Sequence, residues 1–212
     1  MSKLICFFSI ILSFTSVFSQ NTCTCNVAIC NQTWMTHNLT TVTYRNGDTI
    51  PQVKNPTAWA NLTTGAWCYY NNDSTSESTY GKLYNWYAVT DPRGLAPWCW
   101  SIPSFSDWTT LIQNCLVSDQ GIKMKTTGNS LWTVNIGATN SSGFSAVPGG
   151  FRNDVGSFFD LHNAAYFWSR SQDPNNPGGA TSLGLTGIGN GVSFPNPDKR
   201  SGLSVRCIKQ CN

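Results

Sequence analysis

The 212-residue sequence predicts an α+β domain of short, twisted antiparallel strands and long ordered loops packed around two helices. Three observations predict this class. One amphipathic segment near the middle of the chain carries clear helix-start signals, whereas most other apolar runs are short, rich in β-formers and separated by Gly, Asn and Pro. Charged residues make up only 11% of the chain and aromatics reach 13%, so a core can form and loops must supply the polar surface. We expect a single domain.

The N-terminus has the pattern of a secretory signal peptide spanning residues 1–19. Lys3 supplies the positive region, Leu4–Phe18 is apolar, and cleavage after Ser19 would leave Gln20 first. A retained membrane anchor is the alternative, but the run falls short of the roughly twenty residues that span a bilayer. We therefore expect an exported protein, secreted or at the cell surface and not membrane-spanning. Residues 20–33 then form a Cys-rich leader, and residues 34–212 form the domain.

Cysteines outside the signal peptide are even in number, which predicts a disulfide framework in an oxidising compartment. They are Cys23, Cys25, Cys30, Cys68, Cys99, Cys115, Cys207 and Cys211. Eight cysteines allow 105 pairings, and the spacing does not choose among them. The cluster Cys23–Cys30 could also suggest zinc, but no histidine is well placed beside it, so we expect disulfides and no metal site.

The central helix is expected to begin after Ser104. Its hydroxyl can cap the helix, Asp107 stands at the third helical position, and Pro103 blocks extension backwards. Phe105, Trp108, Leu111, Ile112 and Cys115 fall on one face at helical spacing. The pattern predicts an amphipathic helix of about ten to twelve residues.

Other elements follow from local signals. Asn46–Gly47 between two β-prone runs predicts a hairpin. Leu203, Val205 and Cys207 alternate with Ser204 and Arg206, which predicts a final strand with the latter two facing outward. The remaining expectations are a helical turn at Trp59–Leu62, a second short helix at Leu83–Val89, a tight turn at Gly149–Gly150, and strands at Ala66–Tyr70, Tyr166–Ser169, Thr181–Thr186 and Val192–Phe194.

Catalytic constellations are scarce, and we expect no catalytic residue and no cofactor. His37 and His162 lack metal-ligand spacing and are interpreted as structural histidines. The single glutamate, Glu77, lies in a polar segment where a solvated side chain is expected. A net charge of +3, scattered along the chain, does not indicate a nucleic-acid partner.

Two tryptophans, Trp98 and Trp132, stand in loop contexts among Pro, Ser, Thr and Asn. Exposed aromatics of this kind suit stacking against sugars or peptides, so both are candidate binding residues, with burial in the core as the alternative for each.

Six ordered motifs resemble the Fibrobacter succinogenes major paralogous domain, a family of exported proteins of Bacteroidetes and related bacteria. The motifs are Trp34–Leu39, Tyr44–Pro51, Tyr80–Trp86, Gly143–Arg152, Phe167–Ser169 and Leu203–Cys207. Arg152 and Trp168 match these motifs, and packing would account for both. The helix start around Ser104, Asp107 and Trp108, together with the closing strand, also resembles formylglycine-generating enzymes, which implies a C-type-lectin-like fold.

The resemblance has further implications. In C-type-lectin-like domains the two termini run side by side, so a disulfide would join the group Cys23, Cys25 and Cys30 to Cys207 or Cys211. The unusual place of Cys99, three positions from the family's cysteine, puts any carried-over pairing in doubt. We expect a non-catalytic surface module that binds a glycan or a surface protein. The alternatives are a self-associating structural subunit of a surface assembly, and an oxidase-like enzyme related to the formylglycine-generating enzymes.

Overall fold

The computed structural model describes residues 26–211 of the chain. The expected signal peptide and residues 20–25 of the Cys-rich leader, which include Cys23 and Cys25, lie outside these residues.

The described chain has the mixed α+β character that the sequence predicts, with ten strands and short helices. The strands are β1 (Asn26–Ile29), β2 (Gln32–Met35), β3 (Trp67–Cys68), β4 (Leu83–Tyr84), β5 (Trp100–Ser101), β6 (Gly149–Arg152), β7 (Phe158–Leu161), β8 (Ala164–Gln172), β9 (Ala180–Thr186) and β10 (Ile208–Lys209). The helices are α1 (Pro56–Ala60), α2 (Glu77–Tyr80), α3 (Trp86–Val89), α4 (Phe105–Thr109) and α5 (Gln120–Met124), with 3₁₀ turns η1 (Tyr70–Asn72) and η2 (Ser74–Ser76) and a π-helical segment η3 (Thr110–Leu116).

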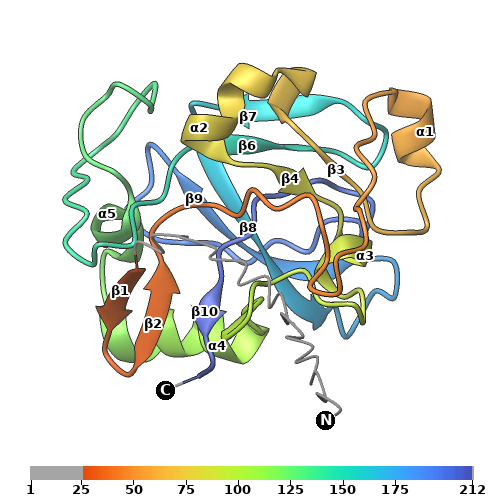
Figure 1. Ribbon diagram of the computed structural model, residues 1–212. Coiled ribbons are helices and arrows are strands. Elements are labelled where there is room, and N and C mark those ends of the chain that lie inside the picture. The colour runs from red at the N-terminus through yellow and green to blue at the C-terminus, as the bar shows by residue number, and fades with distance from the viewer. Residues whose placement is uncertain (1–25, 212) are drawn as a thin grey trace, which may run out of the picture.

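One small sheet joins the two ends of the described chain, in the order β1-β2-β10-β5 (Figure 1). β1 and β2 form a hairpin, and Ile208 of β10 lies antiparallel to Trp34 of β2 and to Ser101 of β5. The N- and C-terminal segments therefore run side by side, as expected.

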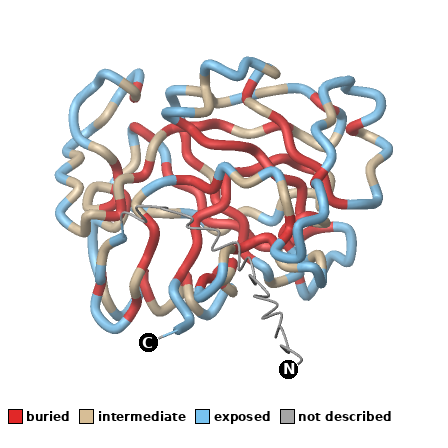
Figure 2. Tube along the Cα trace, viewed as in Figure 1, coloured by how far each residue is buried: buried red, intermediate tan, exposed pale blue. Residues whose placement is uncertain are grey.

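The second four-stranded sheet has the order β7-β6-β8-β9. Its β8–β9 hairpin crosses the middle of the molecule, where the chain is buried on both sides (Figures 1 and 2). The tight turn expected at Gly149–Gly150 is wrong, because both glycines lie inside β6. Gly150 has a φ of 60°, and a Cβ there would stand 2.2 Å from the Phe159 carbonyl oxygen, so the tight approach of β7 requires glycine.

The central helix begins as predicted. Ser104 caps α4 by accepting a hydrogen bond from the Asp107 N–H at 3.1 Å, and the Asp107 carboxylate accepts from the Ser104 N–H at 2.8 Å, which closes a capping box. After Thr109 the helix widens into η3, where Val117 N–H bonds to the Ile112 carbonyl five residues back. Trp108, Leu111 and Ile112 of the predicted apolar face are buried, whereas Phe105, the first residue of α4, is 41% exposed.

Three fully buried cations hold loops together through carbonyl oxygens. Arg152 donates to the carbonyls of Val53, Lys54 and Gly156; Lys125 donates to those of Thr186, Gly187 and Gly189; Arg206 donates to Asn38 Oδ1 and to the carbonyls of Met35, Phe144 and Ser145. None of the three forms an ion pair with a described carboxylate. The prediction that Arg206 faces outward is wrong: it is 0% exposed.

Ser204 is buried as well, so the alternation expected in the last strand is also wrong. Residues 202–204 make single bridges to separate neighbours on both sides instead of forming one edge strand, with Leu203 paired to Tyr84 and Ser204 to Phe167. A segment flanked on both sides by other chain segments buries both of its faces, which period-two alternation does not anticipate.

The six cysteines of the described chain are free thiols in the structure. Cys68 and Cys207 are buried in separate clusters of the core, whereas Cys30, Cys99 and Cys211 are exposed and Cys115 is half-buried. Cys30 lies beside Cys115 and Cys99 beside Cys211. The β1–β2 turn thus places Cys30 near the end of η3 and not at Cys207 or Cys211. The expected link from the group Cys23, Cys25 and Cys30 to Cys207 or Cys211 stays a prediction for Cys23 and Cys25, which lie outside the described residues.

None of the helices within residues 26–211 has the length and apolar character that crossing a bilayer requires.

Candidate functional site

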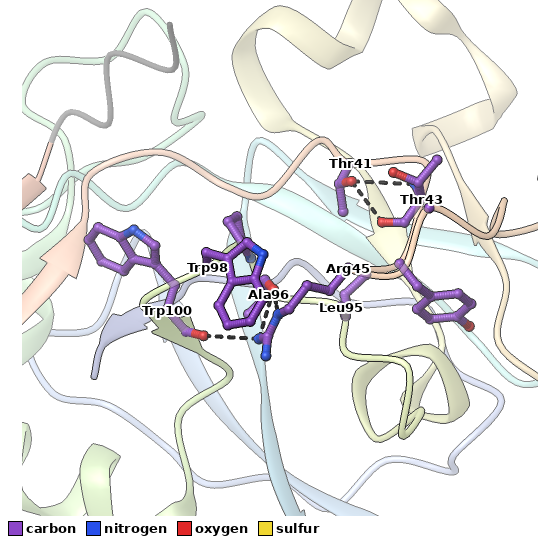
Figure 3. A pocket seen from close by; sticks show the side chains of 10 residues that line it. Thr41, Thr43, Arg45, Leu95, Ala96, Trp98 and Trp100 are labelled. Atoms are coloured by element: carbon purple, nitrogen blue, oxygen red, sulfur yellow. Dashed lines mark hydrogen bonds between the residues drawn. The ribbon is translucent and has the colours of Figure 1, made fainter. Parts of the chain in front are cut away.

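A surface cleft of about 440 Å³ opens between the Thr41–Gly47 hairpin and the loop that leads from α3 to β5 (Figure 3). Thr41, Thr43, Tyr44, Arg45 and Gly47 line one wall, and Leu95, Ala96, Pro97, Trp98 and Trp100 line the other. The hairpin forms as the sequence predicts, with Thr43 paired to Thr49 and Gly47 at a φ of 94° in the turn. The cleft thus combines two segments about fifty residues apart in the sequence.

Trp98 is 78% exposed at the edge of this cleft, which makes it the most exposed large apolar side chain in the described chain. The guanidinium carbon of Arg45 lies 5.3 Å from the centre of its ring. The two side chains lie together in Figure 3, one from each wall. An exposed indole normally carries a cost in water, so an indole held beside a cation at a cleft is typical of a contact surface.

Arg45 is fixed by the opposite wall. Its Nε and Nη2 donate to the carbonyl of Ala96 at 3.2 and 3.0 Å, and Nη2 also reaches the carbonyl of Trp100. Its Nη1 and the hydroxyl of Thr43 make no hydrogen bond to any described residue. These two groups can therefore donate to a bound molecule beside the Trp98 ring.

Backbone contacts hold the two walls in register. The Arg45 N–H donates to the Gly94 carbonyl at 2.8 Å. Gly94 has a φ of 82°, and a Cβ at this position would stand 3.3 Å from the Arg45 guanidinium carbon. Glycine at position 94 lets the loop approach the arginine closely.

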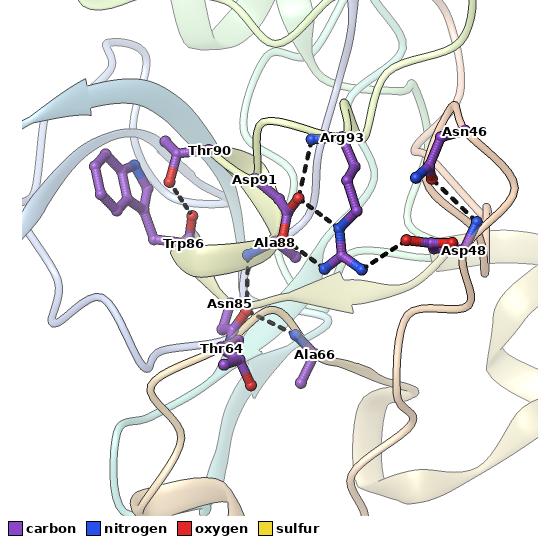
Figure 4. A network of polar contacts seen from close by, with 10 residues as sticks. All are labelled: Asn46, Asp48, Thr64, Ala66, Asn85, Trp86, Ala88, Thr90, Asp91 and Arg93. Carbon is purple, nitrogen blue, oxygen red and sulfur yellow. Dashed lines mark hydrogen bonds and ion pairs between the residues drawn. The ribbon is translucent and has the colours of Figure 1, made fainter.

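A polar network behind the cleft ties the same hairpin to the end of α3 (Figure 4). Arg93 forms a two-pronged ion pair with Asp91 and reaches Asp48 of the hairpin turn at 3.1 Å. The guanidinium also lies 4.1 Å from the centre of the Tyr44 ring. Hydrogen bonds from Arg93 lower the pKa of Asp91 to about 2, and burial raises the pKa of Tyr44 to about 12. At neutral pH Asp91 and Arg93 are therefore both charged, and the Tyr44 hydroxyl is neutral.

The second candidate binding residue is placed elsewhere. Trp132 is 1% exposed, and its Nε1–H donates to the Thr126 hydroxyl at 3.0 Å while Lys125 lies 5.6 Å from its ring centre. The expectation that Trp132 offers an exposed stacking face is therefore wrong. The structure shows the alternative given for Trp132, burial in the core, with the indole N–H satisfied by Thr126 of the same polar segment.

The remaining titratable candidates have structural partners. His162 contacts the Tyr80 hydroxyl at 3.2 Å and the Leu131 carbonyl at 2.8 Å, as expected for a structural histidine. Glu77 is not a solvated side chain, because it pairs with the buried Lys82 and accepts from the Tyr69 hydroxyl at 3.1 Å. Within residues 26–211, His, Cys, Asp and Glu do not gather into a group that could hold a metal ion.

Comparison with known sequences identifies the family. A sequence model of the Fibrobacter succinogenes major domain matches residues 27–209. The chain belongs to this family. No curated protein and no solved structure matched it.

Motif residues of this Fibrobacter succinogenes major domain act in packing. The Nε1–H of Trp168 donates to the Tyr84 carbonyl at 2.7 Å, and the Arg152 guanidinium lies 4.4 Å from the centre of the Trp59 ring. Neither faces the cleft. Sequence reasoning identified Trp98 but missed Arg45, although the hairpin signal around Asn46–Gly47 already placed that arginine in an exposed turn.

Proposed function

We propose that the protein is an exported, non-catalytic binding module of the cell surface, and that the cleft beside Trp98 recognises a glycan. The observation that carries this proposal is the exposed Trp98 ring held beside Arg45 at the mouth of a preformed cleft. Sugar rings present flat C–H faces that stack on an indole, and their hydroxyls or carboxylates accept hydrogen bonds from groups such as Arg45 Nη1 and the Thr43 hydroxyl.

Rigidity supports the same proposal. Both walls of the cleft are fixed by backbone hydrogen bonds and by the network around Arg93, so little ordering entropy is lost when a ligand binds. Adjacent N- and C-terminal strands and long ordered loops are compatible with a C-type-lectin-like arrangement, which we include in the proposal. A protein of the cell surface is the other ligand class that such a cleft would fit.

A glycan array and a thermal melt of the same samples test the proposal. Trp98→Ala should weaken binding at least about tenfold and leave the melting temperature within about 2 °C, because the side chain is exposed and removes little core packing. Phe159→Ala is the matched control, since Phe159 is 46% exposed and does not line the cleft; it should bind like the wild type.

Three results would count against this assignment. Unchanged glycan binding by Trp98→Ala would show that the cleft is not the glycan-binding site. Binding to surface proteins alone would show that the ligand is a protein and not a glycan. Fibres or end-to-end stacks formed by the purified protein, in place of glycan binding, would favour a structural subunit.

A further inference from the structure

Two cysteines meet at the base of the loop that carries Trp98. β10 lies antiparallel to β5, with Lys209 opposite Trp100, and the Gln210 N–H donates to the Cys99 carbonyl at 2.8 Å. This pairing brings the next residue, Cys211, to Cys99, whose thiol raises the pKa of the Cys211 thiol. Cys99 takes a left-handed φ of 65°, which is uncommon for a residue other than glycine.

A second pair of cysteines is arranged in the same way at the other edge of this sheet. Cys30 lies in the two-residue turn between β1 and β2, again at a left-handed φ, here 52°. Cys115, near the end of η3, places its Sγ 3.9 Å from the carbonyl oxygen of Ile29, the residue before Cys30, and burial together with the Cys30 thiol raises the pKa of Cys115. In both pairs a strained backbone turns one cysteine toward a partner that is distant in the sequence.

We propose that Cys99–Cys211 and Cys30–Cys115 are two disulfide bonds of the exported protein, one at each edge of the β1-β2-β10-β5 sheet. In each, two thiols lose two protons and two electrons as one S–S bond forms. The oxidant is a protein or small-molecule disulfide, which takes up both electrons and both protons and becomes two thiols. Cys68 and Cys207 are buried in separate clusters of the core, and neither has a cysteine partner within residues 26–211.

The first bond would have a consequence for the cleft. Trp98 immediately precedes Cys99, so a Cys99–Cys211 bond ties the Trp98 loop to β10 and holds the indole at its place beside Arg45. This consequence rests on the proposed function, whereas the bonds themselves are tested without any ligand.

Peptide mapping of the non-reduced protein, secreted into an oxidising compartment, tests the pairing. Trypsin alone leaves Cys99 and Cys115 in one peptide, because no Lys or Arg lies between Arg93 and Lys123. A second protease that cleaves before Asp107 separates them, and fragment ions from Asn26–Ile29 separate Cys30 from Cys23 and Cys25. We expect linked peptides for both proposed pairs. A linkage of Cys99 or Cys30 to any other cysteine, or both as free thiols, would overturn the proposal.

Thiol labelling of the native protein provides a second measurement. Cys211→Ser should add one maleimide-reactive thiol, Cys99, relative to the wild type, and the double variant Cys99→Ser/Cys211→Ser should return to the wild-type count. Cys207→Ala, four residues away and fully buried, is the control and should add none. No added thiol in Cys211→Ser would refute the pair.

A melting experiment with ligand binding separates this proposal from the function. Reductant should lower the melting temperature of the wild type by on the order of 10 °C, because each bond closes a loop of roughly a hundred residues, and should lower that of the double variant less. Mapped disulfides without any glycan binding would leave the bonds standing and reject the function. Glycan binding with the thiols unpaired would reject the disulfide bonds and leave the proposed function standing.

Discussion

Replacing Arg206 by methionine should be among the most damaging single changes in this fold. The side chain is 0% exposed, and burial lowers its pKa to about 9, so the guanidinium remains charged at neutral pH. It donates to Asn38 Oδ1 at 2.8 and 3.1 Å and to three backbone carbonyls at 2.5 to 3.4 Å. Methionine fills a similar volume but donates no hydrogen bond.

The magnitude follows from these acceptors. Each buried acceptor left without a partner costs about 1 to 3 kcal/mol, and the guanidinium also lies 4.6 Å from the centre of the Phe144 ring. Removing a buried charge recovers part of its desolvation energy. We therefore expect Arg206→Met to lower the free energy of unfolding by about 3 to 5 kcal/mol, a large share of a typical total.

Urea denaturation followed by circular dichroism measures this loss. The matched control is Arg93→Met, which removes an arginine with two ion pairs whose side chain is 40% exposed, and should cost less than about 1 kcal/mol. Arg206→Lys keeps the charge but loses the planar fork, and should fall between the two. Equal losses of unfolding free energy for Arg206→Met and Arg93→Met would refute the view that buried cations bonded to backbone carbonyls hold this fold.

Three further predictions concern local elements. Ser104→Ala should lower the free energy of unfolding by about 1 kcal/mol through loss of the capping box, and an unchanged urea midpoint would contradict that role. Gly150→Ala should cost several kcal/mol because its Cβ meets backbone atoms at 2.2 and 2.7 Å, whereas Gly47→Ala, with open space around it, should cost only about 1 to 2 kcal/mol of left-handed strain in the same assay. The pKa of Asp91 is lowered to about 2, so its contribution is complete above the ordinary value near 4 and is lost as pH falls from about 4 to 2. The stability difference between the wild type and Asp91→Asn should shrink over that window, and a constant difference would exclude the ion pair as its source.

Local signals predicted much of the fold. The capping box at Ser104 and the turn at Asn46–Gly47 depend on hydrogen bonds between residues at most four apart, so the sequence contains all the information they need. The short helix expected at Leu83–Val89 also depends on local hydrogen bonds. The structure shows its second half as α3, whereas Leu83 and Tyr84 form strand β4. These elements form where local chemistry and tertiary packing agree.

Other features could not be predicted from local pattern. Arg206 looked like an outward-facing residue because its neighbours alternate, and only packing on both sides of its segment shows that it is buried. Trp98 and Trp132 have similar neighbours in the sequence, yet one is 78% exposed and the other 1%. Exposure of a loop aromatic depends on which distant segment covers the loop, and that is a property of the whole fold.

The buried cations explain how a chain with so little regular structure can hold its loops in place. Loop carbonyls buried away from water need donors, and the chain has only ten acidic residues with which cations could otherwise pair. Arg152 and Arg206 each satisfy at least three acceptors from two segments far apart in sequence, whereas Lys125 satisfies three carbonyls of the single segment 186–189. None of these acceptors belongs to the cleft walls, which are held by the contacts of Arg45 and Arg93 instead, so Trp98 is not needed to hold a loop. A substitution at Trp98 can therefore change what the cleft contacts without loosening the fold. A substitution at Arg152 or Arg206 would loosen the fold without changing the side chains that line the cleft.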